Sequence, residues 1–325
     1  MGTAAGARAT GGMTARVLVT GGSGFIGSQV VARLAASDEV DQVVSVDIAA
    51  RGRAEGVRIE RMDVRDPGLV DLIASEGIDR VVHLAAVVTP RPDHTREFLY
   101  SVDVEGTANV VEACLAGGVR HLVVTSSGAA YGYHPDNPLW IDEDHPLRGN
   151  PGFAYSDHKR IVEENLEKVR SEHPELGQLV LRPGTILGET VDNQITALFE
   201  RPVVLGIAGA ETLFVFIWDT DVVDVVVAGT LGERTGIYNL AGDGAVPLRD
   251  IARELGKPYL PVPTGLVKGV LWALRRLRLT GYGPEQVDFL RYRPVLSNRR
   301  LVEEFGYTPS KTSAEALRAW AASRG

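Results

Sequence analysis

Thr20-Gly21-Gly22-Ser23-Gly24-Phe25-Ile26-Gly27 joins the apolar run 17–19 to an amphipathic segment. A buried strand that turns on glycines into a helix leaves backbone N–H groups pointing outward at the positive end of that helix, where a phosphate binds well. We expect Gly21 to make the tight turn, Gly24 to let a pyrophosphate approach, and Gly27 to pack the helix on the sheet. Glycine-rich turns also occur as plain loops, so the interpretation depends on the segments that follow.

The expected context is a second strand, formed by the apolar run 43–46, that ends in an acidic residue. Asp47 lies about 20 residues after the last glycine of the turn, where a carboxylate binds the adenosine ribose hydroxyls of NAD and would repel the 2′-phosphate of NADP. The competing interpretation is that Asp47 caps a helix after the strand. The sequence therefore predicts NAD as the cofactor, with contacts from Gly21, Gly24, Phe25, Ile26, Gly27 and Asp47.

Length and composition exclude several classes of protein. The 325 residues, 44% hydrophobic and 23% charged, suffice for one large domain or for a domain with a smaller appendage. A net charge of −8 argues against nucleic acid or an anionic membrane as the main partner, and a single cysteine, Cys114, fits a reducing compartment. Residues 1–13 lack a signal segment and are expected to be a disordered leader. We expect a cytoplasmic protein without an integral membrane segment.

Strands and helices are expected to alternate at regular spacing beyond the second strand. The expected strands are 80–84, 121–125, 179–181 and 236–240, and the expected helices are 98–117, 155–169 and 221–231. This alternation predicts parallel βαβ units in a doubly wound parallel sheet of the Rossmann type. Residues 133–153, which contain four prolines, are predicted to form an exposed loop, and 188–211 are predicted to be irregular.

The same pattern predicts the layout of the domains. Residues 14–188 are expected to form the NAD-binding domain, and 214–242 are expected to return to it. Residues 189–213 and 243–325 are expected to form the smaller, mostly C-terminal, substrate-binding region.

Further cofactor contacts are expected where other strands end. Asp63 is expected to hold the adenine amino group, while Asp66 caps a helix that begins at Pro67. After the strand, Leu84 is followed by Ala85 and Ala86, whose side chains are small enough to let a cofactor lie against the backbone. His83, inside the strand, is interpreted as a packed core residue rather than a catalyst.

Three residues predict the chemistry. Tyr155 and Lys159 are four residues apart in a segment of helical periodicity and so share one helix face, and Ser127 follows the carboxyl end of an expected strand. A tyrosine with a pKa of about 10 is a poor base, but a neighbouring lysine ammonium favours the phenolate and lowers that pKa. We therefore expect oxidation of a secondary alcohol: Tyr155 takes the hydroxyl proton, Lys159 assists it and holds the nicotinamide ribose, and Ser127 orients the hydroxyl.

Together the motifs resemble those of the extended short-chain dehydrogenase/reductase superfamily, in particular the NAD-dependent epimerase/dehydratase family. They are TGGSGFIG at 20–27, Asp47, HLAA at 83–86, TSSGAAYG at 125–132, YSDHK at 155–159 and LRPGTILG at 181–188. The resemblance covers most of residues 16–245 and implies a doubly wound sheet that binds NAD and a region that closes over a small-molecule substrate. It implies Tyr155 as base, Lys159 as its helper and Ser127 as hydroxyl partner, together with a homodimer formed through the Tyr155 helix. The remaining implied cofactor contacts are Asp63, Val64, Leu84, Ala85, Ala86 and Pro183, and no metal ion is expected.

Departures from the family pattern narrow the expected reaction. Dehydratases of this family carry Asp-Glu directly after the catalytic Ser or Thr, and decarboxylating relatives carry Glu, whereas Gly128 and Ala129 stand there in this chain. Dehydration and decarboxylation are therefore disfavoured. Asp103 stands where the family has Asn, and it can only accept hydrogen bonds. Thr185 replaces an Asn that contacts the diphosphate of UDP-sugars, and Trp218 replaces a histidine; both are expected substrate contacts, with Ser127.

The sequence leaves three functions open. The first is a sugar or nucleotide-sugar epimerase-like oxidoreductase. The second is a dehydrogenase/reductase of a hydrophobic alcohol, similar to 3β-hydroxysteroid dehydrogenase, which the apolar stretch 198–216 would suit. The third, a non-catalytic NAD-binding protein, is disfavoured because Tyr155 and Lys159 are both present. A basic amphipathic segment, 267–279, could lie on a membrane, form a partly exposed helix or form a dimer face.

Overall fold

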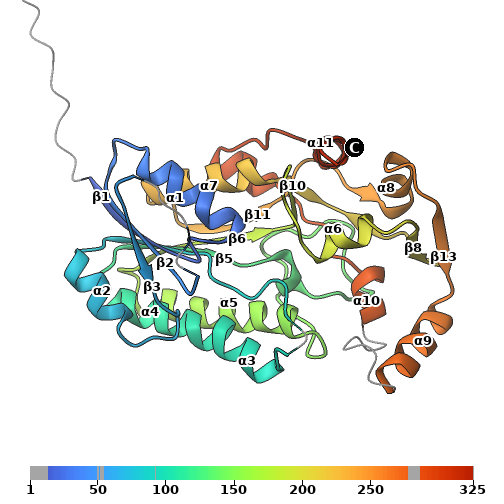
Figure 1. Ribbon diagram of the computed structural model, residues 1–325, viewed down its shortest axis with the longest axis horizontal. Helices are drawn as coiled ribbons and strands as arrows, with labels where there is room; N and C mark the ends of the chain where they lie inside the picture. Colours follow the sequence, from blue (N-terminus) through green and yellow to red (C-terminus); the bar gives the residue numbers. More distant parts are fainter. Residues whose placement is uncertain (1–13, 50, 52–54, 92, 277–285, 325) are drawn as a thin grey trace, which may run out of the picture.

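A seven-stranded parallel sheet forms the centre of the molecule (Figure 1). The computed structural model describes residues 14–49, 51, 55–91, 93–276 and 286–324, so the expected leader 1–13 lies outside the described residues. The strand order is β11-β6-β5-β4-β1-β2-β3. The bounds are β1 Ala15–Thr20, β2 Val40–Asp47, β3 Val57–Arg61, β4 Arg80–His83, β5 His121–Thr125, β6 Gly177–Pro183 and β11 Gly236–Leu240. The predicted doubly wound Rossmann sheet is confirmed.

The order of the strands reverses at β1, which pairs with β2 on one side and with β4 on the other. Open α/β sheets bind ligands outside the carboxyl ends of their strands at such a reversal. The turn that follows β1 lies at this point, so the fold brings the glycine motif to the place where a ligand is expected.

Helices cover both faces of the sheet (Figure 1). The helices α1 Phe25–Ala35 and α7 Asp219–Leu231 lie on one face, and α2 Leu69–Glu76, α4 Gly106–Ala116 and α5 Ala154–Glu172 lie on the other. Within β1, Leu18 packs into the core on the α2, α4 and α5 side, while Val17 and Val19 pack into the core on the α1 and α7 side. A strand covered on both faces is apolar along its whole length, which explains the continuous hydrophobic run.

The helical run expected at 98–117 contains a π-helical turn. It consists of α3 Arg96–Tyr100, the π-helical segment η1 Ser101–Glu105, and α4. Such wider turns occur frequently at functional sites. Asp103, in the middle of the turn, is buried and lines the cavity described below.

A smaller region follows the sheet, on the right of Figure 1. Its three two-stranded pairs are β7 Thr185–Leu187 with β10 Phe216–Trp218, β9 Leu213–Phe214 with β12 Val246–Pro247, and β8 Val204–Ile207 with β13 Tyr259–Val262. Its helices are α6 Gln194–Phe199, α8 Leu248–Glu254, α9 Thr264–Arg276, α10 Gln286–Arg291 and α11 Ser313–Ala322. The short segment η3 Leu301–Phe305 returns to the large sheet, where Leu301 and Phe305 join the core beside α7. None of the helices in the described part of the chain is long and apolar enough to cross a bilayer.

Three local predictions were wrong. Residues 188–211 are not irregular: the Asn193 side chain caps α6 in a reciprocal box with Thr196, and β8 pairs with β13. The helix predicted from Pro67 begins at Leu69, because the Asp66 carboxylate accepts a hydrogen bond from Gly68 N at 2.8 Å and holds a turn there. The loop 133–153 lacks helix and strand as predicted, yet it is not exposed throughout, since Ile141 and Glu143 are buried.

Candidate functional site

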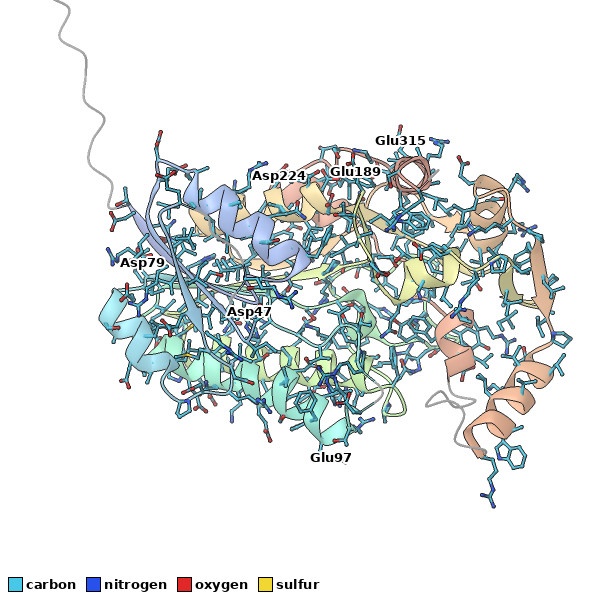
Figure 2. The ribbon with its side chains drawn as sticks, in the orientation of Figure 1. Asp47, Asp79, Glu97, Glu189, Asp224 and Glu315 are labelled. Carbon is cyan, nitrogen blue, oxygen red and sulfur yellow. The ribbon has the colours of Figure 1, made fainter. Side chains whose placement is uncertain are left out.

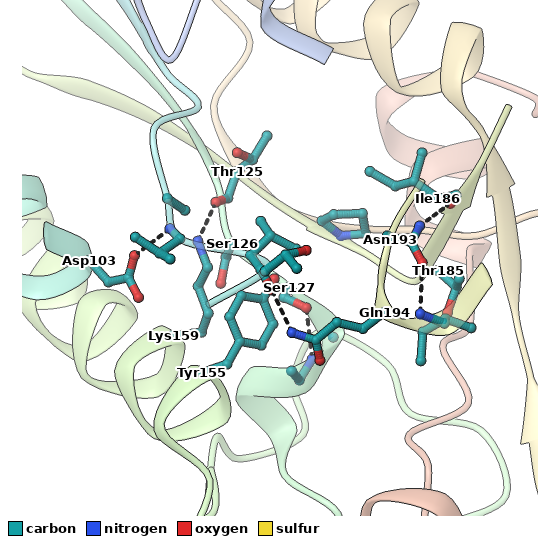
Figure 3. A pocket seen from close by; sticks show the side chains of 18 of the residues that line it. Asp103, Thr125, Ser126, Ser127, Tyr155, Lys159, Thr185, Ile186, Asn193 and Gln194 are labelled. Atoms are coloured by element: carbon teal, nitrogen blue, oxygen red, sulfur yellow. Dashed lines mark hydrogen bonds between the residues drawn. The ribbon is translucent and has the colours of Figure 1, made fainter. Parts of the chain in front are cut away.

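A cavity of about 840 Å³ lies at the carboxyl ends of the central strands, between the sheet and the smaller region. It brings together the glycine turn, the tip of β5, the start of α5 and residues from α6 and α10. The predicted site residues that line it are Gly21, Gly24, Phe25, Ile26, Gly27, Leu84, Ala86, Ser127, Tyr155, Lys159, Pro183 and Thr185. Across the cavity, Gln194 of α6 donates a hydrogen bond to Val88 O at 3.2 Å (Figure 3).

The glycine turn has the geometry of an anion cradle. Gly21 adopts a positive φ of 71°, and a Cβ there would lie 2.7 Å from Ala85 N. A Cβ on Gly27 would lie 2.0 Å from Gly21 O, so helix and turn approach too closely for any side chain. Gly24 is the N-cap of α1, no side chain caps the helix, and its first turn holds no acidic residue. The first N–H groups of α1 are therefore left for an external anion, and the turn fits the pyrophosphate of a dinucleotide.

Asp47 ends β2 beside this turn (Figure 2). Its Oδ2 accepts a hydrogen bond from Ser23 N at 3.1 Å, and its Oδ1 accepts one from Ala49 N at 2.9 Å. These bonds fix the carboxylate at the strand end, although Asp47 does not line the cavity itself.

Three of the other expected cofactor contacts, Asp63, Val64 and Ala85, interact with other parts of the protein in this structure. Both oxygens of Asp63 accept hydrogen bonds from the Arg65 guanidinium, at 2.9 and 2.7 Å, and this pairing holds the pKa of Asp63 below its ordinary value. Val64 is buried and packs against the core of the sheet. Ala85 meets Gly21 through its backbone but does not line the cavity. The adenine contact of Asp63 thus stays a prediction.

Ser127, Tyr155 and Lys159 lie side by side in the cavity (Figure 3). Lys159 is buried and donates a hydrogen bond from Nζ to Thr125 O at 3.0 Å. Its Nζ lies 5.9 Å from the centroid of the Tyr155 ring. The Ser127 Oγ accepts a hydrogen bond from Ala129 N at 3.1 Å, and the Ser127 side chain lowers the pKa of Tyr155. The structure therefore assembles the three residues that the sequence singled out.

Electrostatics at this cluster act in both directions. Burial raises the pKa of Tyr155, the nearby Ser127 side chain lowers it, and the negative charge of Asp103 raises it. Burial lowers the pKa of Lys159, and the charges of Asp103 and Glu163 oppose that shift. Asp103 therefore favours the protonated lysine but disfavours the phenolate.

Asp103 takes the place of the family asparagine. Its Oδ1 accepts a hydrogen bond from Val87 N at 2.9 Å, and its Oδ2 lies 3.5 Å from Nδ1 of the buried His158 (Figure 3 labels Asp103).

His83 is also buried, and its two ring nitrogens hydrogen-bond to the hydroxyls of Thr20 and Thr107. Burial lowers the pKa of His83 to about 3, so this ring is neutral and belongs to the core, as expected.

A buried network supports the strand tip behind Ser127. The Arg182 guanidinium contacts the Glu163 carboxylate at 2.6 Å, and Ser126 Oγ donates to Glu163 at 2.5 Å. The space beside Gly128 is filled by Leu296, since a Cβ on that glycine would lie 2.8 Å from a Leu296 methyl carbon. Leu296 would have to shift to admit the acidic side chain that a dehydratase carries after its serine, so packing disfavours that side chain.

Arg293 is the residue that sequence reasoning missed. It lines the cavity near Thr185, and its Nη2 donates a hydrogen bond to Thr185 Oγ1 at 3.2 Å. The guanidinium lies 4.3 Å from the centroid of the Phe214 ring and 4.9 Å from that of Phe289. Its Nη1 is shut off from solvent and has no hydrogen-bond partner among the residues that the structure describes, and burial lowers the pKa of the group. The sequence around Arg293 is of mixed polarity and contains no motif that would have identified this residue as part of the site.

Trp218 does not lie where it was expected. Its ring is buried in the core of the smaller region with Phe214 and Phe216, and Lys311 Nζ lies 4.8 Å from its centroid. Trp218 does not line the cavity, because β10 pairs with β7 and turns this side chain into the core. The expected substrate contact of Trp218 is therefore not supported.

Comparisons with known proteins identify the family of this chain and several relatives. Residues 17–230 match the NAD dependent epimerase/dehydratase family. A UDP-glucose 4-epimerase of Mycolicibacterium smegmatis is 32% identical over 329 residues, which cover 93% of this chain and 96% of the relative. A 3β-hydroxysteroid dehydrogenase/Δ5→4-isomerase of vaccinia virus (strain Copenhagen) is 28% identical over 191 residues, 56% of this chain and 54% of the relative. The crystal structure of a Thermus thermophilus UDP-glucose 4-epimerase in complex with NAD superposes with a TM-score of 0.72 and 26% identity, covering 95% of this chain and 99% of that one. The chain belongs to the NAD-dependent epimerase/dehydratase family.

Proposed function

We propose that the protein is an NAD-dependent epimerase of a nucleotide sugar, which oxidises a ring hydroxyl to a ketone and reduces the ketone on its opposite face. Three features of the cavity support it: the cluster of Ser127, Tyr155 and Lys159, the anion cradle at the start of α1, and the cationic side chain of Arg293. The family and the Mycolicibacterium smegmatis UDP-glucose 4-epimerase support it.

Each residue of the cluster has a defined task. Tyr155 removes the proton of the substrate hydroxyl, and Ser127, which lies beside Tyr155 in the cavity, holds the substrate oxygen. The Lys159 ammonium favours the phenolate electrostatically and offers further N–H donors to a cofactor ribose. NAD, when bound, supplies the acceptor for the hydride and its donor in the return step. Tyr155 then gives its proton back to the alkoxide of the product.

The residues expected to hold NAD are those of the cradle and of the strand ends. Gly24 and the first N–H groups of α1 would take the pyrophosphate, and Asp47 would take the adenosine ribose hydroxyls. Replacing Asp47 by alanine should weaken NAD binding relative to NADP, because the carboxylate that pairs with ribose and repels a 2′-phosphate is removed. Titration with each dinucleotide measures the ratio of the two affinities, and an unchanged ratio would contradict the assignment.

Arg293 is the observation that favours a nucleotide sugar over a neutral alcohol. Within the described part of the chain no carboxylate is paired with its guanidinium, and one nitrogen has no partner at all. The guanidinium lies against the rings of Phe214 and Phe289, and its planar pair of donors suits two oxygens of a phosphate. Thr185 Oγ1, already bonded to Arg293, provides a further polar contact at the same place. We infer that the substrate diphosphate binds here.

A hydrophobic alcohol is the second candidate, favoured by the vaccinia virus relative and by the apolar lining contributed by Phe289, Ile195 and Leu296. An uncharged steroid would displace water from the cavity without pairing with the Arg293 guanidinium, and this would reduce its binding free energy by about 1–3 kcal/mol. This penalty makes it the weaker candidate.

A substrate panel separates the possibilities. The purified protein is incubated with NAD and, in turn, UDP-glucose, UDP-galactose, dTDP-glucose or a 3β-hydroxysteroid. The epimer is quantified by NMR and reduced cofactor by its absorbance. We expect an epimer of a nucleotide sugar without accumulation of NADH, since the cofactor is recycled in place. Stoichiometric NADH with the steroid would establish the dehydrogenase instead, and NAD binding without any turnover would favour a non-catalytic protein.

A further inference from the structure

The strands β8 and β13 and the helix α9 form an edge of the smaller region at the right of Figure 1, and these elements carry exposed apolar side chains. Of the twelve exposed large hydrophobic residues among those described, five lie there: Leu205 (57% exposed), Leu260 (52%), Leu266 (60%), Val270 (48%) and Trp272 (63%). We call these five residues the α9 rim. Leu205 and Leu260 are partners in the parallel pair of β8 and β13, and β13 leads directly into α9. The five residues therefore belong to adjoining elements.

The charge around the α9 rim is opposite to that of the whole chain. The net charge is −8, yet residues 257–276, which include all of α9, contain four basic residues and not one acidic residue. In α9 itself, Lys268 pairs with Asp288 of α10 at 3.6 Å, and Arg276, at the end of the helix, is exposed. The rim thus combines an apolar surface with a local excess of positive charge.

We propose that the α9 rim binds the surface of a lipid bilayer that contains anionic lipids. A helix with an exposed apolar side, a tryptophan and basic residues can lie in the interface, with its apolar side chains among the acyl chains and its cations at the phosphates. Trp272 suits the headgroup level, where tryptophan is enriched. With 13 residues, α9 spans about 20 Å, which is shorter than the hydrocarbon core, so it lies on the bilayer rather than across it.

Charge argues against a second copy of the chain as the occupant. A two-fold contact through α9 would bring two identical cationic segments together, and like charges at an interface cost several kcal/mol. An anionic lipid surface instead complements the segment. The negative charge of the rest of the molecule is compatible with this, because screening limits its reach to about 8 Å at physiological salt. Since α10 contacts α9 and contributes Phe289 to the cavity, attachment at the rim would keep the cavity near the bilayer.

Vesicle flotation with the full chain tests the proposal. We expect the protein to float with phosphatidylcholine vesicles that contain phosphatidylglycerol, to float far less with pure phosphatidylcholine, and to dissociate as salt is raised. The double substitution Leu266→Ser/Trp272→Ser should lower the affinity for anionic vesicles at least about tenfold. Leu139→Ser, at an exposed position of the loop 133–153, is the matched control and should bind like the wild type.

Fluorescence adds a readout at one residue. Emission should move to shorter wavelength when anionic vesicles are added, Trp272→Phe should abolish most of this shift, and Trp140→Phe, at another exposed tryptophan, should retain it. The proposal is overturned if anionic vesicles do not bind the wild type at low salt, or if the double variant binds them equally well. It is also overturned if the wild type dimerises without binding vesicles and the double variant is monomeric, which would assign the rim to a second copy.

Discussion

Replacing Arg293 by methionine separates the binding of a substrate phosphate from the stability of the free protein. Methionine can keep the contact with Phe214 and Phe289 but removes the guanidinium, whose Nη1 has no partner among the described residues. A hydrogen bond to a charged group contributes about 1.5–3 kcal/mol. Loss of the phosphate contact should therefore weaken the binding of a UDP-hexose about 10- to 150-fold.

The free protein should respond in the opposite direction. Removing a half-buried charge that has no carboxylate partner among the described residues relieves a desolvation cost of about 1 kcal/mol, which corresponds to a rise in Tm of about 2 °C. Calorimetric titration of the NAD-loaded protein with a UDP-hexose and a thermal melt without ligand measure the two effects. Arg293→Lys is the matched control, because it keeps the charge but loses the planar pair of donors, and it should bind with intermediate affinity. Affinity within twofold of wild type, or a fall in Tm of several degrees, would refute the reasoning by making Arg293 a structural residue.

Two further substitutions test the environment of the cluster. Asp103→Asn removes a negative charge that raises the pKa of Tyr155, so that pKa should fall. The rising limb of the pH profile of kcat/KM should then move to lower pH. If the limb does not move, Asp103 does not influence the base. Gly128→Ala places a Cβ 2.8 Å from a methyl carbon of the buried Leu296. We expect chemical denaturation to show a loss of about 1–3 kcal/mol in the free energy of unfolding. An unchanged denaturation midpoint would show that the site can relax.

The sheet could be predicted because its signals are local. Parallel strands covered on both faces are continuous apolar runs, and the glycine turn identifies the first βα unit by its backbone requirements alone. Tyr155 and Lys159 could be paired by helical spacing, and the tip of β5 brought Ser127 to them. In each case the interaction is encoded within a few residues of the chain.

The smaller region could not be predicted because its contacts are distant in sequence. The strand β8 pairs with β13, which follows only after β9 to β12, so no periodicity near 204–207 reveals it. Arg293 becomes a site residue only when the segment after α10 folds back beside Thr185. Trp218 was assigned to the substrate because it stands where the family has a histidine, but β10 turns it into the core. The homodimer and the cytoplasmic location stay predictions.

Deuterium tracing tests whether the cluster performs a reversible oxidation within the active site. A nucleotide sugar deuterated at the carbon to be oxidised is converted by the NAD-loaded protein, and the deuterium content of the epimer is read by NMR. We predict that the wild type retains the label in the product and that Tyr155→Phe forms no product although it binds NAD as tightly. Loss of the label to water, or wild-type turnover by Tyr155→Phe, would contradict the assignment of Tyr155 as the base of a hydride-transfer reaction.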